Sequence, residues 1–129
     1  MAANRAVLAK TISAKPVLMK QAHGAGVILL DVDTHPGQTG EAAVCTRPGQ
    51  ACTVLIADCL PVLFSDERGP LVAAAHVGWR GLARQQSAGL GVRKIYGNDG
   101  SAAWCTAHND SRFFSYRRDG VCGRMAASI

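Results

Sequence analysis

Short apolar runs, separated by turn-forming residues, dominate the pattern of hydrophobic and polar positions along the chain. Runs of about four to eight residues that are rich in Val, Ile, Leu and Ala are typical of buried strands. We expect strands at Val17–Met19, Gly26–Val32, Ala42–Thr46, Cys52–Ala57, Pro61–Ser65, Leu71–His76 and Val92–Tyr96. The predicted fold class is α/β, with a mixed, largely antiparallel sheet flanked by helices.

Helices are predicted at fewer places than strands. Asn4 can cap a helix over Arg5–Ser13, and a second helix can begin within Gly81–Ala88. Gly and Pro interrupt the pattern in the loop Thr34–Gly40 and the turn Arg47–Gly49.

Two hairpins are predicted from turn chemistry. Asp66–Gly69 can reverse the chain between two apolar runs, although Pro70 then removes one backbone donor. The dipeptide Asp119-Gly120 predicts a second hairpin, which would join strands at Phe113–Tyr116 and Cys122–Met125.

Length and composition predict one domain with a real core. The chain has 129 residues, of which 48% are hydrophobic, but only 5% are aromatic, so small aliphatic side chains fill the core. The formal net charge is +5, yet the basic residues are scattered and their longest run is Arg117-Arg118. We therefore expect no nucleic-acid partner. No segment approaches the roughly 20 apolar residues of a membrane span.

The five cysteines favour a reducing compartment. Their number is odd, they form no CxxC pair, and the first ten residues contain no apolar signal segment. We expect a cytoplasmic protein with reduced thiols.

Three chemically reactive side chains stand at the ends of apolar segments. Cys59 and His76 each follow an apolar run, and His23 stands in KQAHG, with Pro61, Gly78 and Gly24 close behind them. Reactive groups are often found where strands end. From spacing alone, these residues fit a buried thiol with hydrogen-bonded imidazoles, a nucleophilic dyad of Cys59 and His76, or a metal site.

A copper oxidase requires more histidine than the chain has. A His₂Cys set also suits a copper electron-transfer site. A multicopper oxidase needs several His-rich centres, and the chain has only His23, His35, His76 and His108.

Four long motifs resemble the laccase-domain family. They are KQAHG, TVLIADCLPVLF, VAAAHVGWRGLA and the tail FFSYRRDGVCGRMAASI, and the resemblance covers roughly Asn4–Ala83 and Leu90–Ile129. Members of that family were once labelled polyphenol oxidoreductases and are now regarded as purine nucleoside phosphorylases with adenosine deaminase side activity. The resemblance implies purine nucleoside and phosphate as substrates.

The resemblance also implies a catalytic metal. The family motifs place one Zn²⁺ on the residues that correspond to His23, Cys59 and His76. Three protein ligands leave the fourth tetrahedral position open, as in catalytic zinc sites. Asp58 and Arg80 are the candidate catalytic residues. Asp58 would either orient a ligand histidine or cap backbone N–H groups, and Arg80 would either pair with phosphate or lock its turn by an ion pair.

The remaining candidate residues are expected to have structural roles. We expect His35 and His108 at the surface, Trp79 in the core, and the other cysteines as small apolar fillers. The tail arginines are interpreted as structural, with phosphate binding as the alternative; they are Arg117, Arg118 and Arg124.

The chain also departs from the family pattern. Relatives are roughly twice as long, and we expect residues 1–129 to be a single laccase-like domain without the family's N-terminal segment and middle section. Apolar strand faces that the middle section covers would then favour a homodimer or a monomer of low stability. The alternative function is a catalytically impaired relative that acts as a metal-binding or partner-binding domain.

Overall fold

The computed structural model describes residues 2–78, 94, 96–97 and 101–129. The helix expected within Gly81–Ala88 lies outside the described residues, as does most of the strand expected over Val92–Tyr96. In the part of the chain that is described, no helix is both long and apolar enough to cross a membrane.

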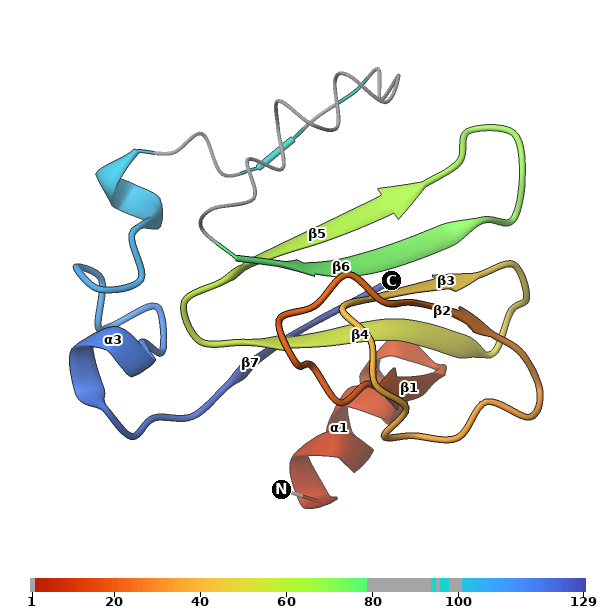
Figure 1. Ribbon diagram of the computed structural model, residues 1–129, viewed down its shortest axis with the longest axis horizontal. Coiled ribbons are helices and arrows are strands. Elements are labelled where there is room, and N and C mark those ends of the chain that lie inside the picture. Colours follow the sequence, from red (N-terminus) through yellow and green to blue (C-terminus); the bar gives the residue numbers. More distant parts are fainter. Residues whose placement is uncertain (1, 79–93, 95, 98–100) are drawn as a thin grey trace.

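The strands form two sheets that pack against each other (Figure 1). A three-stranded sheet has the order β1-β4-β7, with β1 parallel and β7 antiparallel to the central strand. Its strands are β1 (Lys15–Leu18), β4 (Gln50–Ile56) and β7 (Met125–Ser128). The sheet class predicted from the sequence is confirmed, but the strands are divided between two sheets.

The second sheet has four strands in the order β2-β3-β6-β5. Strand β2 runs parallel to β3, and the other two pairings are antiparallel. The strands are β2 (Val27–Leu30), β3 (Ala42–Cys45), β5 (Leu60–Ser65) and β6 (Val72–Val77). Each overlaps the apolar run that predicted it, with ends that differ by one or a few residues.

The N-terminal helix is confirmed, but its predicted start is wrong. Helix α1 spans Ala2–Ile12, so Asn4 lies in the first turn and does not cap the helix. The residues before Asn4 include two alanines, which have the highest helix propensity, and the helix extends through them. The backbone leaves the helix at Ser13, whose φ is 53°.

The predicted hairpin at Asp66–Gly69 is confirmed. Strands β5 and β6 pair from Leu60 with Val77 to Ser65 with Val72, and the Asp66 N–H donates to the Leu71 carbonyl at 3.0 Å. The register places the first residues of β5 beside the last residues of β6.

The second predicted hairpin is wrong. The residues before Gly120 form a short helix, α3 (Tyr116–Asp119), and β7 then pairs with β4. The Ser115 hydroxyl caps α3 by accepting from the Arg118 N–H, and Gly120 ends it with a φ of 68°. A glycine with positive φ ends a helix as readily as it makes a hairpin turn, so Asp119-Gly120 does not distinguish the two structures.

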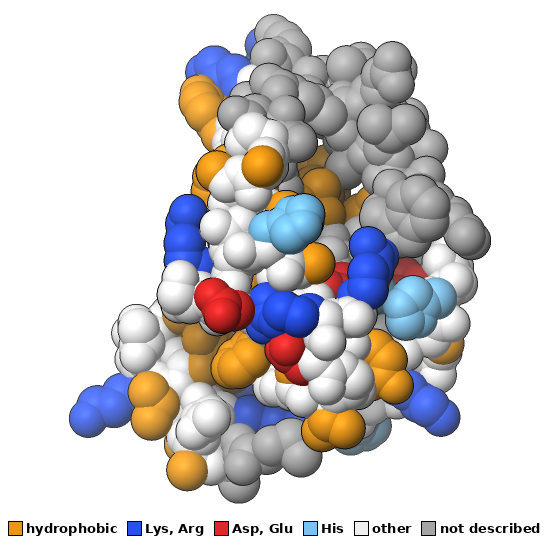
Figure 2. Space-filling model, turned by 90° about the vertical axis from the view of Figure 1, so that its left-hand side faces the viewer, with side chains coloured by type: hydrophobic (Ala, Val, Ile, Leu, Met, Phe, Trp, Pro, Cys, Tyr) orange, Lys and Arg blue, Asp and Glu red, His pale blue; other side chains and the backbone are white. Residues whose placement is uncertain are grey.

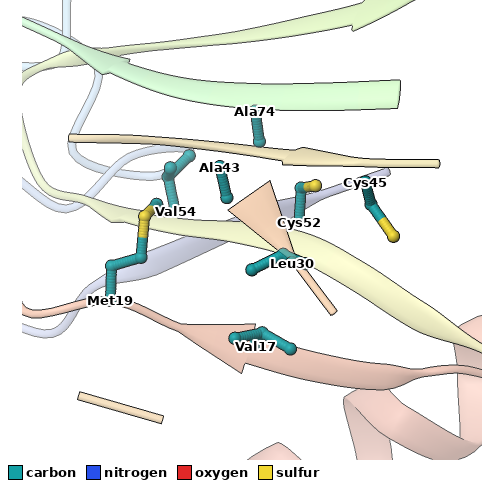
Figure 3. Close-up of a cluster of buried hydrophobic side chains, with 8 residues drawn as sticks. All are labelled: Val17, Met19, Leu30, Ala43, Cys45, Cys52, Val54 and Ala74. Atoms are coloured by element: carbon teal, nitrogen blue, oxygen red, sulfur yellow. The ribbon is translucent and has the colours of Figure 1, made fainter. Parts of the chain in front are cut away.

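Small side chains between the sheets form the core, as the composition predicted. Figure 3 shows the cluster, which comprises Val17, Met19, Leu30, Ala43, Cys45, Cys52, Val54 and Ala74. Two of the predicted fillers, Cys45 and Cys52, are fully buried. Burial, together with the nearby Cys45, raises the pKa of the Cys52 thiol to about 11, which keeps it in its neutral form.

Replacing Val54 by alanine is expected to destabilise the fold. The side chain is 0% exposed, so its two lost methyl groups leave a cavity and should lower the free energy of unfolding by about 2–3 kcal/mol. The matched control is Val121→Ala, because Val121 is 90% exposed and should change stability by less than about 0.5 kcal/mol. Urea denaturation measures both, and equal effects would contradict the assigned core.

Candidate functional site

Three segments that are distant in sequence bring the predicted metal ligands together. His23 lies in the loop between β1 and β2, Cys59 in the turn between β4 and β5, and His76 near the end of β6. One ligand atom from each residue lies within 4.8 Å of the other two. The imidazoles of His23 and His76 meet edge to face, with 5.0 Å between their centroids.

The hairpin explains why Cys59 and His76 are neighbours. Pro61 pairs with His76 across the β5–β6 ladder, and Cys59 stands immediately before β5. Antiparallel pairing therefore places the thiol next to the end of β6, although the two residues are far apart along the chain.

The Gln21 side chain holds the His23 loop against β4. Its carboxamide donates to the Leu55 carbonyl and accepts from the Leu55 N–H, both at 2.9 Å. These two bonds resemble the pair that a residue of a neighbouring strand would make with Leu55, and they fix the position of the chain two residues before His23. His23 itself has a φ of 58°, a conformation that costs a non-glycine residue roughly 1–3 kcal/mol and persists only where surrounding contacts enforce it.

Glu41 is a residue of the candidate site that the sequence analysis missed. Its Oε2 lies 2.6 Å from the Nδ1 of His76, and the two side chains are only 8% and 6% exposed. Its Oε1 accepts from the backbone N–H groups of Ala22 and Gly24, on either side of His23. The sequence contained one signal for it, since Glu41 directly precedes the apolar run AAVC. An acidic residue next to a buried strand indicates a paired carboxylate, because acidic residues are rarely buried unless they are paired.

These contacts also control the ionisation of Glu41. Burial alone would raise its pKa, but the hydrogen bonds from His76, Ala22 and Gly24 outweigh burial and hold the pKa below the usual value. The carboxylate is therefore charged and acts as an acceptor only.

Asp58 anchors the C-terminal segment beside the site. Its Oδ1 accepts from the hydroxyls of Thr106 and Ser115 at 2.8 and 2.6 Å, and its Oδ2 accepts from the Arg117 N–H at 3.0 Å. Burial opposes ionisation, but these bonds hold the pKa of Asp58 below its usual range. Of the two alternatives for Asp58, the structure favours capping, because the carboxylate that contacts a predicted ligand histidine is Glu41.

The three predicted ligands lie in a cleft together with the start of α3. The cleft has a volume of about 740 Å³, which is within the range of small-molecule sites, and is lined by His23, Gly24, Glu41, Asp58, Cys59, His76, Gly78, Tyr116 and Arg117. Two residues that the sequence analysis singled out, Arg80 and Trp79, lie outside the described residues. Figure 2 shows the side of the molecule where η1 (Ala102–Trp104) and α3 lie, with basic, acidic and hydrophobic side chains intermixed.

The tail arginines have different surroundings. Arg118 donates to the carbonyls of Thr106 and Phe113 and to the carboxylate of Asp119, which fits the structural role expected for it. Arg117 instead contributes to the lining of the cleft. The expected surface positions of His35 and His108 are confirmed.

The donor set fits a zinc ion. Tetrahedral zinc with bonds of about 2.0–2.3 Å needs donor atoms roughly 3.3–3.8 Å apart, so donors within 4.8 Å need only small movements. Burial and the charges of Asp58 and Glu41 raise the pKa of the Cys59 thiol, which disfavours an activated thiolate in a metal-free dyad. The presence of His23 beside the pair also favours the metal alternative.

Replacing Ser115 by alanine should weaken the attachment of α3 to the cleft. The buried hydroxyl caps α3 and donates to the Asp58 carboxylate, so its loss should lower the free energy of unfolding by about 2–3 kcal/mol. Ser65→Ala, at the exposed end of β5, is the control and should have little effect. Denaturant unfolding with tyrosine and tryptophan fluorescence measures both variants, and an unaffected Ser115→Ala would contradict the anchor.

Comparison with known proteins agrees with the motifs. The model of the family described as multi-copper polyphenol oxidoreductase laccase matches residues 1–88 and 82–129. Purine nucleoside phosphorylase YfiH of Escherichia coli K12 is 30% identical over 192 aligned residues, which cover 97% of this chain and 77% of that protein. Purine nucleoside phosphorylase PA4543 of Pseudomonas aeruginosa is 44% identical over 80 residues, which cover 62% of this chain and 32% of that protein.

Solved structures have the same fold. The crystal structure of Neisseria meningitidis protein NMB0706 superposes with a TM-score of 0.71 at 26% identity, and covers 97% of this chain and 78% of that one. The YfiH protein of Bacillus licheniformis gives a TM-score of 0.74 at 20% identity, with the same two coverages. The chain therefore belongs to the multi-copper polyphenol oxidoreductase laccase family, in which several relatives carry the name purine nucleoside phosphorylase.

Proposed function

We propose that this protein is a zinc-dependent purine nucleoside phosphorylase that acts on inosine, adenosine or guanosine. The observation that carries the proposal is the convergence of His23, Cys59 and His76 in a cleft, in a chain whose relatives are named for this activity. The expected cytoplasmic location and the homodimer stay predictions.

The proposed reaction exchanges one bond at the anomeric carbon of ribose for another. The C–N bond to the purine breaks and its electron pair leaves with the base, which takes up a proton. A phosphate oxygen forms the new bond to the same carbon, so the products are the free base and ribose 1-phosphate. The protein must therefore hold an anion and a nucleoside side by side in a fixed orientation.

His23, Cys59 and His76 would hold the zinc ion. A zinc ion with three protein ligands can polarise a substrate oxygen or lower the pKa of a bound water. The chain's own contribution is to present two imidazoles and one thiol sulfur in a fixed arrangement, which Gln21, Glu41 and the β5–β6 hairpin maintain.

Arg117 is the proposed anion ligand among the described residues. Asp58 accepts its backbone N–H, and the residue lines the cleft that holds the three metal ligands. A guanidinium can pair with two phosphate oxygens at once. Arg80 stays a predicted phosphate ligand, and Asp58 is proposed to position the cleft wall rather than to contact substrate.

The comparisons support an internally shortened domain. The alignment with the Escherichia coli relative runs over 192 residues although this chain has 129, so that relative carries residues that have no counterpart here. The family model also matches in two separate segments, which overlap at residues 82–88. A shortened middle section supports the second candidate, a metal-binding relative with impaired catalysis.

We also propose adenosine deamination as a second activity of the same site. The open coordination position expected of a three-ligand site supports it, since deamination needs an activated water. Ammonia release from adenosine in the absence of phosphate separates this activity from phosphorolysis, which needs phosphate.

Replacing Cys59 by alanine should abolish both metal binding and phosphorolysis. The purified protein should carry about one zinc per chain, and the variant should lose it because a two-histidine remnant binds weakly. The matched control is Cys105→Ala, which removes a partly buried thiol that is not part of the group. Elemental analysis and an inosine phosphorolysis assay measure both properties.

The outcomes separate the candidate functions. Equal zinc content in the two cysteine variants would refute the metal site. Zinc in the wild-type protein without turnover of inosine, adenosine or guanosine would favour the catalytically impaired alternative.

Replacing Arg117 by alanine should selectively weaken phosphate use. The loss of a charge-assisted contact worth about 1.5–3 kcal/mol should raise the KM for phosphate about 10- to 100-fold. Zinc content should not change, because Arg117 is not part of the ligand group. Arg5→Ala, on the exposed side of α1, is the charge-matched control. An unchanged KM would exclude Arg117 as the anion ligand.

A further inference from the structure

We infer that Glu41 selects the tautomer of His76 and so acts as the positioning residue of the metal centre. This inference rests on the proposed function, because it concerns the same three ligands. It adds a fourth residue, which would not touch the metal but would determine which nitrogen atom His76 presents to it.

The contact between Glu41 and His76 is short and enclosed. Oε2 of Glu41 lies 2.6 Å from Nδ1 of His76, within a pair of side chains that are 8% and 6% exposed. The backbone joins the same two residues, because the His76 N–H donates to the Glu41 carbonyl at 2.7 Å. Two bonds between one pair of residues fix both the position of β6 and the orientation of the imidazole ring.

The position of the hydrogen atom on the His76 ring determines which nitrogen can bind a metal. A carboxylate can only accept, so the imidazole must carry its hydrogen on Nδ1. A neutral imidazole has one hydrogen, and its Nε2 then has a free lone pair. Carboxylates that accept from the second nitrogen of a ligand histidine orient the ring and raise its basicity.

The other oxygen of the same carboxylate acts on the second histidine. Oε1 of Glu41 accepts from the N–H groups of Ala22 and Gly24, which flank His23. His23 has a φ of 58°, so these bonds hold the loop in a conformation that it would not adopt without support. One buried side chain thus places two ligands that come from different strands and loops.

The variant Glu41→Gln separates the tautomer effect from loop support. The glutamine oxygen can still accept from Ala22 and Gly24, while its NH₂ group faces His76. The opposite orientation would place this NH₂ group against two N–H donors, so it is unfavourable. With an amide donor opposite, Nδ1 must accept and the ring hydrogen moves to Nε2, the atom that the metal needs.

The expected result is a loss of zinc affinity without loss of the fold. Zinc affinity should fall about 10- to 100-fold in Glu41→Gln, as is typical when the outer hydrogen-bond partner of a ligand histidine is removed. In metal-free Glu41→Gln, the ¹⁵N chemical shifts of Nδ1 and Nε2 of His76 should be the reverse of those in the wild-type protein, because the other nitrogen is protonated. Glu41→Asp keeps an acceptor-only side chain, so it should keep the wild-type tautomer and bind zinc more tightly than Glu41→Gln.

The experiment measures three properties of the full chain. Competition with a chromophoric chelator gives zinc affinity, ¹⁵N NMR of the histidine side chains gives the tautomer, and thermal unfolding gives stability. Glu67→Gln makes the same chemical change in the exposed β5–β6 turn and is the matched control. Cys59→Ala reports on the proposed metal site itself.

The results distinguish failure of the inference from failure of the proposed site. Wild-type zinc affinity in Cys59→Ala would refute the proposed metal site. Loss of zinc in Cys59→Ala, combined with unchanged affinity and an unchanged tautomer in Glu41→Gln, would overturn the inference alone. If Glu41→Gln fails to fold, Glu41→Asp is the test. An altered His76 tautomer in Glu41→Asp, together with zinc affinity as low as that of Cys59→Ala, would contradict an acceptor role for the Glu41 carboxylate.

Discussion

The buried carboxylate of Glu41 links the fold to the candidate site. A charged group away from water is tolerated only where hydrogen bonds replace its lost hydration. Glu41 meets this requirement with the His76 ring and with two backbone N–H groups of the His23 loop. These bonds therefore hold the loop, the start of β3 and the end of β6 in an arrangement in which both histidines lie close together.

Asp58, a half-buried carboxylate that also lines the cleft, holds a second set of segments together. Its carboxylate gathers the hydroxyls of Thr106 and Ser115 and the N–H of Arg117, all from the C-terminal part of the chain. Cys59 follows it directly, so the residue that anchors the cleft wall is adjacent to a predicted ligand. Two carboxylates, each with three hydrogen-bond partners, thus join the segments around the cleft that are distant in sequence.

The sequence pattern correctly predicted features that depend on residues close together in the chain. The β5–β6 hairpin followed from Asp66–Gly69, and that pairing already places Cys59 near His76. The position of His23 beside them did not follow from spacing, and only the family motifs indicated it. Glu41 was missed because its partner is 35 residues away in sequence, and the hairpin at Asp119-Gly120 was wrong because helix ends and turns share the same glycine geometry.

The proposed metal binding and the proposed substrate placement would depend on different parts of this chain. The three predicted ligands and the residues that position them, Gln21 and Glu41, all precede Gly78 and lie in or next to the ends of strands. Two further residues that line the cleft, Tyr116 and Arg117, come from α3, near the C-terminal end of the chain. Orientation of reactants can supply roughly 7–11 kcal/mol of barrier lowering, and losing about 4 kcal/mol of it costs roughly a thousandfold in rate. If the middle section is shortened as proposed, we therefore expect turnover to fall much more than zinc affinity.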